Sequence, residues 1–266
     1  MPLRRTMVRS NSSINHSTLR SVQLAGSLVA RIIFQPIEET SRVFFSKMLP
    51  PPASRDTAEP KTKDALRIAA RILLTLLLLF THLFLLLATF APPYLPLATA
   101  LFLPPRYHAT SAPTILSAYV YYIPTMAFNG VLEAFLASAC TPADLRAQSR
   151  MMAGASLGFV LAAVGLVRGL AWGDAGLVWA NIANLGARAI YAWVFVKHYF
   201  KQRGMGRVVK ARKTVPPLPV LGVFVAAATA TRWSARVHEG VALGLYAQKG
   251  HVALGGGCVL TCLIAW

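Results

Sequence analysis

Residues 65–90 read ALRIAARILLTLLLLFTHLFLLLATF, and this stretch decides the class of the fold. Its runs LLTLLLLF and THLFLLLATF carry almost no polar side chain apart from threonines and one histidine, His82. A bilayer core about 30 Å thick requires about 20 apolar residues per helix. Because this run is too long for an ordinary core helix, it predicts a helix that crosses a membrane.

The composition of the whole chain fits a membrane setting. Of its 266 residues, 55% are hydrophobic and only 14% are charged, whereas soluble domains carry about 25% charged residues. The mean hydropathy is +0.52. We therefore expect an all-α fold, a polytopic transmembrane helical bundle of about seven spans.

The predicted spans follow from the apolar runs and from the proline-rich or charged breaks between them. They cover residues 21–49, 65–90, 112–139, 150–171, 174–199, 217–231 and 249–266. Residues 1–20 are expected to form a polar, basic, disordered segment ahead of the bundle of residues 21–266. Within that bundle, residues 50–64 and 200–216 are predicted to be exposed linkers. The proline-rich residues 91–111 are predicted to form a structured loop at the membrane surface.

The formal net charge of +18 raises the question of a nucleic-acid partner. In a membrane chain the position of the charge is more informative, because positively charged loops stay on the cytosolic side. The loops after the first, third and fifth predicted spans carry more Lys and Arg than the opposite loops. We expect these loops in the cytosol, the basic residues 200–215 against anionic lipid headgroups, and membrane lipid instead of nucleic acid as a partner.

The first predicted span contains a polar stripe. Four polar side chains follow one another at i, i+4, i+7 and i+11: Arg31, Gln35, Glu38 and Arg42. They share one face of a helix, and ionisable side chains within a span normally face a partner or a water-filled cavity. The stripe therefore predicts a polar path through a kinked helix.

An alternative interpretation rests on Pro36, which could end the first span. Residues 37–49 would then lie on the membrane surface as an amphipathic helix, with Glu38, Glu39 and Arg42 in water. The sequence leaves both readings open.

Two further spans carry polar residues at helical spacing. Asn129 and Glu133 lie at i and i+4 in the third predicted span, and Asn184 and Arg188 lie at i and i+4 in the fifth. The plainer alternatives are that Glu133 is a solvated carboxylate, and that Arg188 forms a structural ion pair with Glu133 or Glu38. Interhelical hydrogen bonds alone would explain the asparagines.

The arginines favour an anionic ligand. A guanidinium group binds phosphate oxygens through a bidentate fork, so two or more arginines in a hydrated cavity fit a lipid phosphate or pyrophosphate better than a neutral drug. The candidate substrate-binding residues are Arg31, Gln35, Glu38, Arg42, Asn129, Glu133, Asn184 and Arg188.

The sequence contains no recognisable enzyme motif. It has no zinc-binding HExxH, no paired Cys/His ligand set and no phosphate-binding glycine loop. Its three cysteines do not suggest a disulfide framework. We expect no catalytic activity, no cofactor and no metal.

Two segments resemble the signature segments of the Rft family. They are residues 30–39 (ARIIFQPIEE), with residues 40–42 directly after, and residues 119–135 (YVYYIPTMAFNGVLEAF). The layout of residues 27–149, including GSL before the first segment and PPY after the second predicted span, is also similar to the family.

The resemblance implies a two-lobed bundle like those of the multidrug/oligosaccharidyl-lipid/polysaccharide exporters, of which this chain would be the C-terminal lobe. The expected partners are dolichyl pyrophosphate oligosaccharide and a missing N-terminal half of the bundle. The implied function is flipping of Man(5)GlcNAc(2)-PP-dolichol from the cytosolic to the luminal leaflet of the endoplasmic reticulum membrane, for N-glycosylation. The alternatives are an ion-coupled small-molecule exporter of the multidrug type and a non-transporting membrane factor that assists N-glycosylation.

Overall fold

A computed structural model of the protein describes residues 32, 34–50, 60–240 and 243–266. This described part contains seven α-helices and no β-strand, which confirms the predicted all-α class. The helices are α2 (Gln35–Met48), α3 (Pro60–Phe102), α4 (Ala112–Ala139), α5 (Pro142–Val164), α6 (Gly173–Gln202), α7 (Leu218–Val237) and α8 (Lys249–Ala265). By length and composition, four helical stretches of this part are apolar enough to cross a membrane: Thr62–Phe102, Ala112–Ala139, Pro142–Gly169 and Leu218–Val237.

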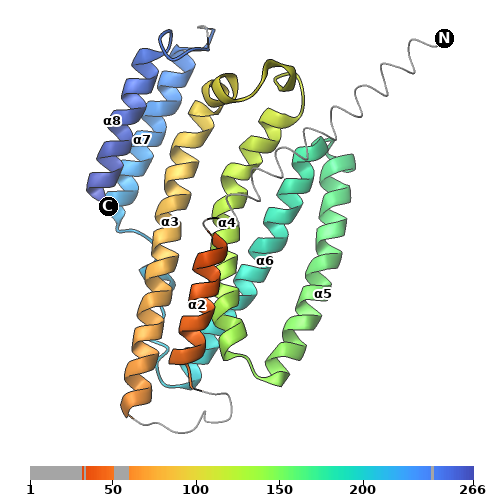
Figure 1. The fold of residues 1–266 in the computed structure, drawn as a ribbon, viewed down its shortest axis with the longest axis vertical. Helices are drawn as coiled ribbons and strands as arrows, with labels where there is room; N and C mark the ends of the chain where they lie inside the picture. Colours follow the sequence, from red (N-terminus) through yellow and green to blue (C-terminus); the bar gives the residue numbers. More distant parts are fainter. Residues whose placement is uncertain (1–31, 33, 51–59, 241–242) are drawn as a thin grey trace, which may run out of the picture.

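The helices run side by side in an elongated bundle with α4 in its interior (Figure 1). Helices α2 and α3 pack on one side of α4 and α6 on the other, while α7 and α8 form a hairpin against the upper half of α3. The main core lies where α2, α3, α4 and α6 meet. In it, the rings of Phe45 and Phe200 contact Phe135 at centroid distances of 5.2 Å and 5.6 Å. Aromatic packing therefore ties α2, α4 and α6 together.

Helix α3 is longer than the sequence indicated. The prediction of a surface loop over residues 91–111 is wrong for its first part, because α3 continues through Pro92, Pro93 and Pro96 to Phe102. Only residues 103–111 connect α3 to α4. With 43 residues, α3 is about 65 Å long, which exceeds the thickness of a bilayer core of about 30 Å.

A contact from α7 replaces part of the backbone bonding that is lost at one of the three prolines inside α3. Proline has no N–H to donate to the carbonyl group four residues earlier. The carbonyl group that Pro92 leaves without its helical donor belongs to Ala88, and the Arg232 side chain of α7 donates to it at 3.4 Å. A neighbouring helix thus takes over part of the missing backbone bonding, as is usual where membrane helices contain proline.

Helix α5 begins eight residues before its predicted start at Arg150. Its N-terminus is a capping box, in which Thr141 and Asp144 satisfy each other's backbone N–H groups, and Pro142 occupies the first turn. The connection between α4 and α5 is therefore only Cys140 and Thr141. Helix α7 also extends past its predicted end at residue 231, whereas α4 has the predicted bounds.

The predicted linkers are shorter than expected. Helix α3 begins at Pro60, so residues 60–64 are helical, and the predicted disorder of residues 1–20 lies outside the described residues. Between α6 and α7, Met205 and Val209 are buried in the main core. Most other residues of this linker are exposed.

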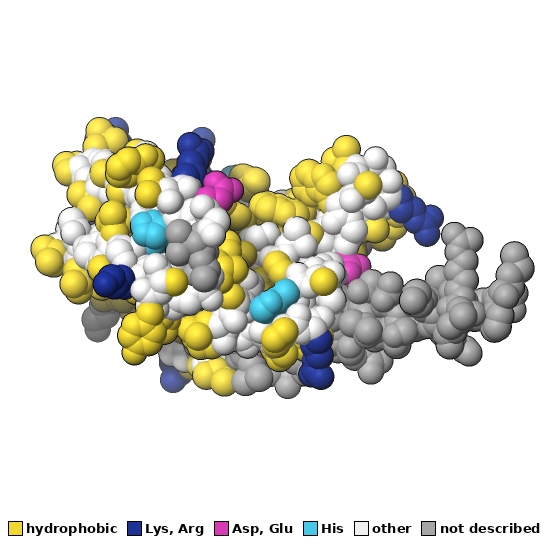
Figure 2. Space-filling view, turned by 90° about the horizontal axis from the view of Figure 1, so that it is seen from above, with side chains coloured by type: hydrophobic (Ala, Val, Ile, Leu, Met, Phe, Trp, Pro, Cys, Tyr) yellow, Lys and Arg dark blue, Asp and Glu magenta, His cyan; other side chains and the backbone are white. Residues whose placement is uncertain are grey.

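The basic linker, the α4–α5 connection and the start of α3 lie at the same end of the bundle (Figure 1). Figure 2 shows the opposite end, where Lys and Arg side chains lie singly among hydrophobic and uncharged groups. By the positive-inside rule we expect the end with the basic linker to face the cytosol, and this orientation stays a prediction.

Candidate functional site

The polar stripe on α2 lies at the edge of its buried face. Phe34, Ser41 and Phe45 are buried against the bundle, and helical geometry turns the stripe about 60° from the centre of that face. Glu38 is therefore half-buried, whereas Gln35 and Arg42 are exposed. Arg31, the fourth residue of the predicted stripe, lies outside the described residues.

Within α2 the polar side chains pair along the helix. Arg42 Nη2 donates to Glu38 Oε1 at 3.0 Å, and Gln35 Nε2 donates to Glu39 Oε1 at 2.9 Å. Helix α2 runs alongside α4 (Figure 1), where Ser138 Oγ donates to the backbone carbonyl group of Arg42 at 3.2 Å. Helix α2 therefore packs against the bundle, while Glu39 and Arg42 are exposed, as the alternative interpretation expected.

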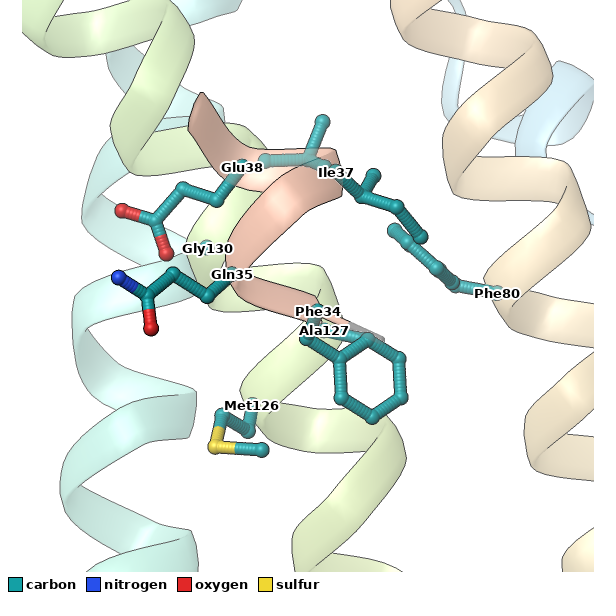
Figure 3. A pocket seen from close by; sticks show the side chains of 9 residues that line it. Phe34, Gln35, Ile37, Glu38, Phe80, Met126, Ala127 and Gly130 are labelled. Carbon is teal, nitrogen blue, oxygen red and sulfur yellow. The ribbon is translucent and has the colours of Figure 1, made fainter. Parts of the chain in front are cut away.

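A cleft of about 240 Å³ lies between α2, α3 and α4. Figure 3 shows that Gln35 and Glu38 point to one side of α2, whereas Ile37 points towards Phe80 of α3. Across the cleft, a β-carbon at Gly130 of α4 would lie only 3.0 Å from Oε2 of Glu38. The glycine lets the carboxylate approach the α4 backbone, and sequence reasoning did not single it out.

The central feature of the polar region is an ion pair between α4 and α6. Arg188 Nε donates to Glu133 Oε1 at 2.8 Å, and Arg188 Nη2 donates to Glu133 Oε2 at 2.7 Å. The side chains are 24% and 18% exposed, respectively. Of the two partners that the sequence left open, Glu133 is the one that Arg188 contacts. This bidentate geometry is also the one in which a guanidinium binds phosphate.

A second contact joins the starts of α4 and α6. Ser111, directly before α4, donates to Asp174 in the first turn of α6 at 2.7 Å. The two helices therefore run in the same direction, and the Glu133–Arg188 pair joins them again further along. The sequence alone could not supply this alignment.

The two predicted asparagines lie near the ion pair on the same helices. Asn129 is 5% exposed, and the side-chain oxygens of Asn129 and Asn184 are buried without a hydrogen-bond partner among the described residues. A buried acceptor without a donor is unfavourable. Each oxygen is therefore available for a donor from water or from a ligand hydroxyl group.

The arrangement brings five predicted residues into one polar region around α4. Glu38 faces Gly130, and Gly130 lies three residues from Glu133, so the α2 stripe and the ion pair occupy neighbouring faces of α4. The other three predicted site residues are not part of this region as described. Gln35 and Arg42 are exposed at its rim, and Arg31 lies outside the described residues. Chemically, the region offers one arginine with a carboxylate counterion, two amide acceptors and one further carboxylate.

Comparison with known sequences identifies the family. The family model described as Rft protein matches residues 8–266. The chain belongs to the Rft family. The two segments that carry the resemblance, residues 30–39 and 119–135, include parts of α2 and α4, the helices on either side of the Glu38–Gly130 contact.

Several curated relatives in the Rft family carry the name Man(5)GlcNAc(2)-PP-dolichol translocation protein RFT1. The chain is 37% identical to that of Yarrowia lipolytica over 182 residues, which cover 66% of this chain and 26% of the relative. It is 30% identical to that of Xenopus tropicalis over 238 residues, 90% of this chain and 42% of the relative, and 31% identical to that of Mus musculus over 235 residues, 88% and 42%. The chain thus spans less than half the length of these relatives. No solved structure matches it.

Proposed function

We propose that this chain takes part in moving Man(5)GlcNAc(2)-PP-dolichol from the cytosolic to the luminal leaflet of the endoplasmic reticulum membrane, for protein N-glycosylation. The relatives named for this translocation support the substrate. The observation that carries the proposal in this chain is the bidentate Glu133–Arg188 pair between two apolar helices.

In this proposal Arg188 is the anion-binding group and Glu133 its counterion while no substrate is bound. An arginine within a membrane bundle is unfavourable without a partner, and Glu133 supplies that partner. A pyrophosphate carries more negative charge than one carboxylate and accepts the same fork of hydrogen bonds. It therefore displaces Glu133, and the exchange keeps the guanidinium paired throughout.

The asparagines give the proposed site a means of contacting sugar. The buried oxygens of Asn129 and Asn184 are acceptors without a hydrogen-bond partner among the described residues, and sugar hydroxyl groups are donors. An amide acceptor beside an arginine therefore suits a headgroup that joins hydroxyl groups to phosphate. A neutral or cationic drug would not use the arginine.

A binding experiment tests the roles of the two partners. The purified chain is placed in lipid nanodiscs, and its affinity for labelled Man(5)GlcNAc(2)-PP-dolichol is measured. We expect Arg188→Gln to abolish binding and Arg188→Lys to retain part of it, because lysine keeps the charge and lacks the fork. Glu133→Gln removes the competing carboxylate, so it is expected to tighten binding several-fold.

The Glu133→Gln variant separates this role from a structural one. If the pair only holds α4 to α6, both Glu133→Gln and Arg188→Gln weaken binding in proportion to their loss of stability. Weaker binding by Glu133→Gln would therefore refute the exchange mechanism. Glycosylation of a secretory glycoprotein, in cells whose own Rft protein is replaced by the variants, then tests the translocation itself.

A further inference from the structure

A basic groove lies on a different face of α3 from the cleft at Glu38. Arg67 and Arg71 of α3 and Lys213 of the linker line this groove, whose volume is about 410 Å³. The two arginines are one helical turn apart and share a face. Leu73, which is fully buried, points from another face of α3 into the main core.

The linker segment is fixed in this position. Thr81 of α3 donates a hydrogen bond from Oγ1 to the backbone carbonyl group of Thr214, at 2.7 Å. On the other side of the groove, Val209 is buried in the main core. The positions of Val209 and Thr214 therefore hold Lys213 beside the two arginines.

Among the described residues, one of the three cations in the groove has a carboxylate partner and two have none. Arg67 contacts Asp64 at 3.2 Å, an exposed pair on the same helix. Among the described residues no carboxylate lies within ion-pair distance of Arg71 or Lys213. Like charges held together are unfavourable, so the groove is suited to an anion that bridges them.

The apolar part of the groove extends from the cations into the membrane. Arg71 is the last charged residue of α3 before an uncharged stretch that continues beyond its end at Phe102. Leu74 and Leu78 follow on the same face, and Val208 lies opposite. The groove thus offers cations at the membrane boundary and an apolar surface directly next to them, which is the pattern of a lipid headgroup above its acyl chain.

We propose that this groove binds an anionic glycerophospholipid, with its phosphate between Arg67, Arg71 and Lys213 and an acyl chain against Leu74 and Leu78. The lining favours this lipid over the glycosylated substrate. It contains cations, apolar side chains and one threonine, with none of the amide or carboxylate acceptors that an oligosaccharide uses. The site is separate from the Glu133–Arg188 pair and does not depend on its role.

Native mass spectrometry of the detergent-purified chain tests the proposal, with phosphatidylinositol and phosphatidylcholine as probes. We expect at least tenfold preference for phosphatidylinositol. Each cation near a membrane surface contributes about fivefold to affinity, so Arg71→Gln should reduce binding about fivefold and Arg67→Gln/Arg71→Gln about 25-fold. The matched control is Arg168→Gln, an exposed arginine at the other end of the bundle, which should leave binding unchanged.

Two further variants distinguish specific binding in the groove from a general attraction of anionic lipid to a basic surface. Leu78→Trp changes no charge and fills the apolar half, so it should weaken phosphatidylinositol binding. Arg71→Lys keeps the positive charge, so it should retain most of the phosphatidylinositol binding. The same variant serves as a control that the fold tolerates a substitution at this position. Equal binding of the two lipids, or no effect of Arg71→Gln and Leu78→Trp, would overturn the proposal. Displacement of phosphatidylinositol by a lower concentration of a polyprenyl diphosphate would also overturn it, because the groove would then be a pyrophosphate site.

Discussion

Replacing Glu133 with glutamine tests how strongly the ion pair stabilises the bundle. Glutamine keeps the shape of the side chain and one acceptor, but it leaves Arg188 charged, because arginine does not lose its proton in proteins. Breaking a fully buried pair costs about 3–5 kcal/mol, and a hydrogen bond to a charged group contributes about 1.5–3 kcal/mol. Since Arg188 is 24% exposed, water reaches part of the guanidinium, and we expect a destabilisation of about 2 kcal/mol.

The opposite substitution should have a smaller effect. Arg188→Met keeps an apolar chain of similar length, so it retains part of the packing that Arg188 makes. We expect a destabilisation of about 1 kcal/mol. The double variant Glu133→Gln/Arg188→Met contains neither charge, so it should be more stable than the sum of the two single effects predicts.

The assay is reversible unfolding of the purified chain in mixed micelles, followed by circular dichroism. The control is Glu38→Gln, which breaks the pair with Arg42 within α2, where the side chains are 37% and 54% exposed. Such exposed pairs contribute at most about 0.5 kcal/mol. The reasoning is refuted if Glu133→Gln is no more destabilising than Glu38→Gln, or if the double variant shows simple additivity.

Three further predictions concern other parts of the chain. Gly255→Ala should cost about 1–3 kcal/mol, because its β-carbon would overlap the hydroxyl group of Tyr94, whereas Gly256→Ala has open space and should be neutral in the same unfolding assay. Thr141→Ala should cost about 1 kcal/mol by removing the cap of α5. Burial raises the pKa of the Cys140 thiol above its ordinary value of 9.0, so less reactive thiolate is present at neutral pH. In sealed microsomes, a variant with Cys140 as its single cysteine should react slowly with an impermeant maleimide added outside, and faster as the pH rises towards and past 9.0. Reaction only after permeabilisation would contradict the cytosolic position of the α4–α5 connection.

The fold class and some helix bounds could be predicted because they depend on neighbouring residues. Helix α4 has the predicted bounds, since proline and polar residues interrupt the apolar run at both ends. The end of α3 could not be predicted in this way. Prolines normally indicate a break, and here the Ala88 carbonyl group is satisfied by Arg232, a residue far along the chain. The information that keeps the helix continuous therefore lies outside its local sequence.

For the candidate site, the sequence predicted the spacing of polar residues but not their orientation. The stripe on α2 has the expected period, yet the buried face is centred on Phe45 and Ser41, so Arg42 projects at the edge. Likewise, two carboxylates remained possible partners for Arg188. The packing of α4 beside α6, which run in the same direction, makes Glu133 the partner. Register between helices is a tertiary property that periodicity does not encode.

The difference between the two arginine-containing sites lies in their counterions. Arg188 has a carboxylate partner on another helix, so an anion binds there only by replacing Glu133, and release restores the ion pair. This exchange limits the net affinity and suits a ligand that must leave. Arg71 and Lys213 have no carboxylate within ion-pair distance among the described residues, so an anion in the groove meets no competitor and is retained. In these two proposals the same type of side chain serves transient binding inside the bundle and lasting binding at the membrane boundary, and the presence or absence of one carboxylate decides between them.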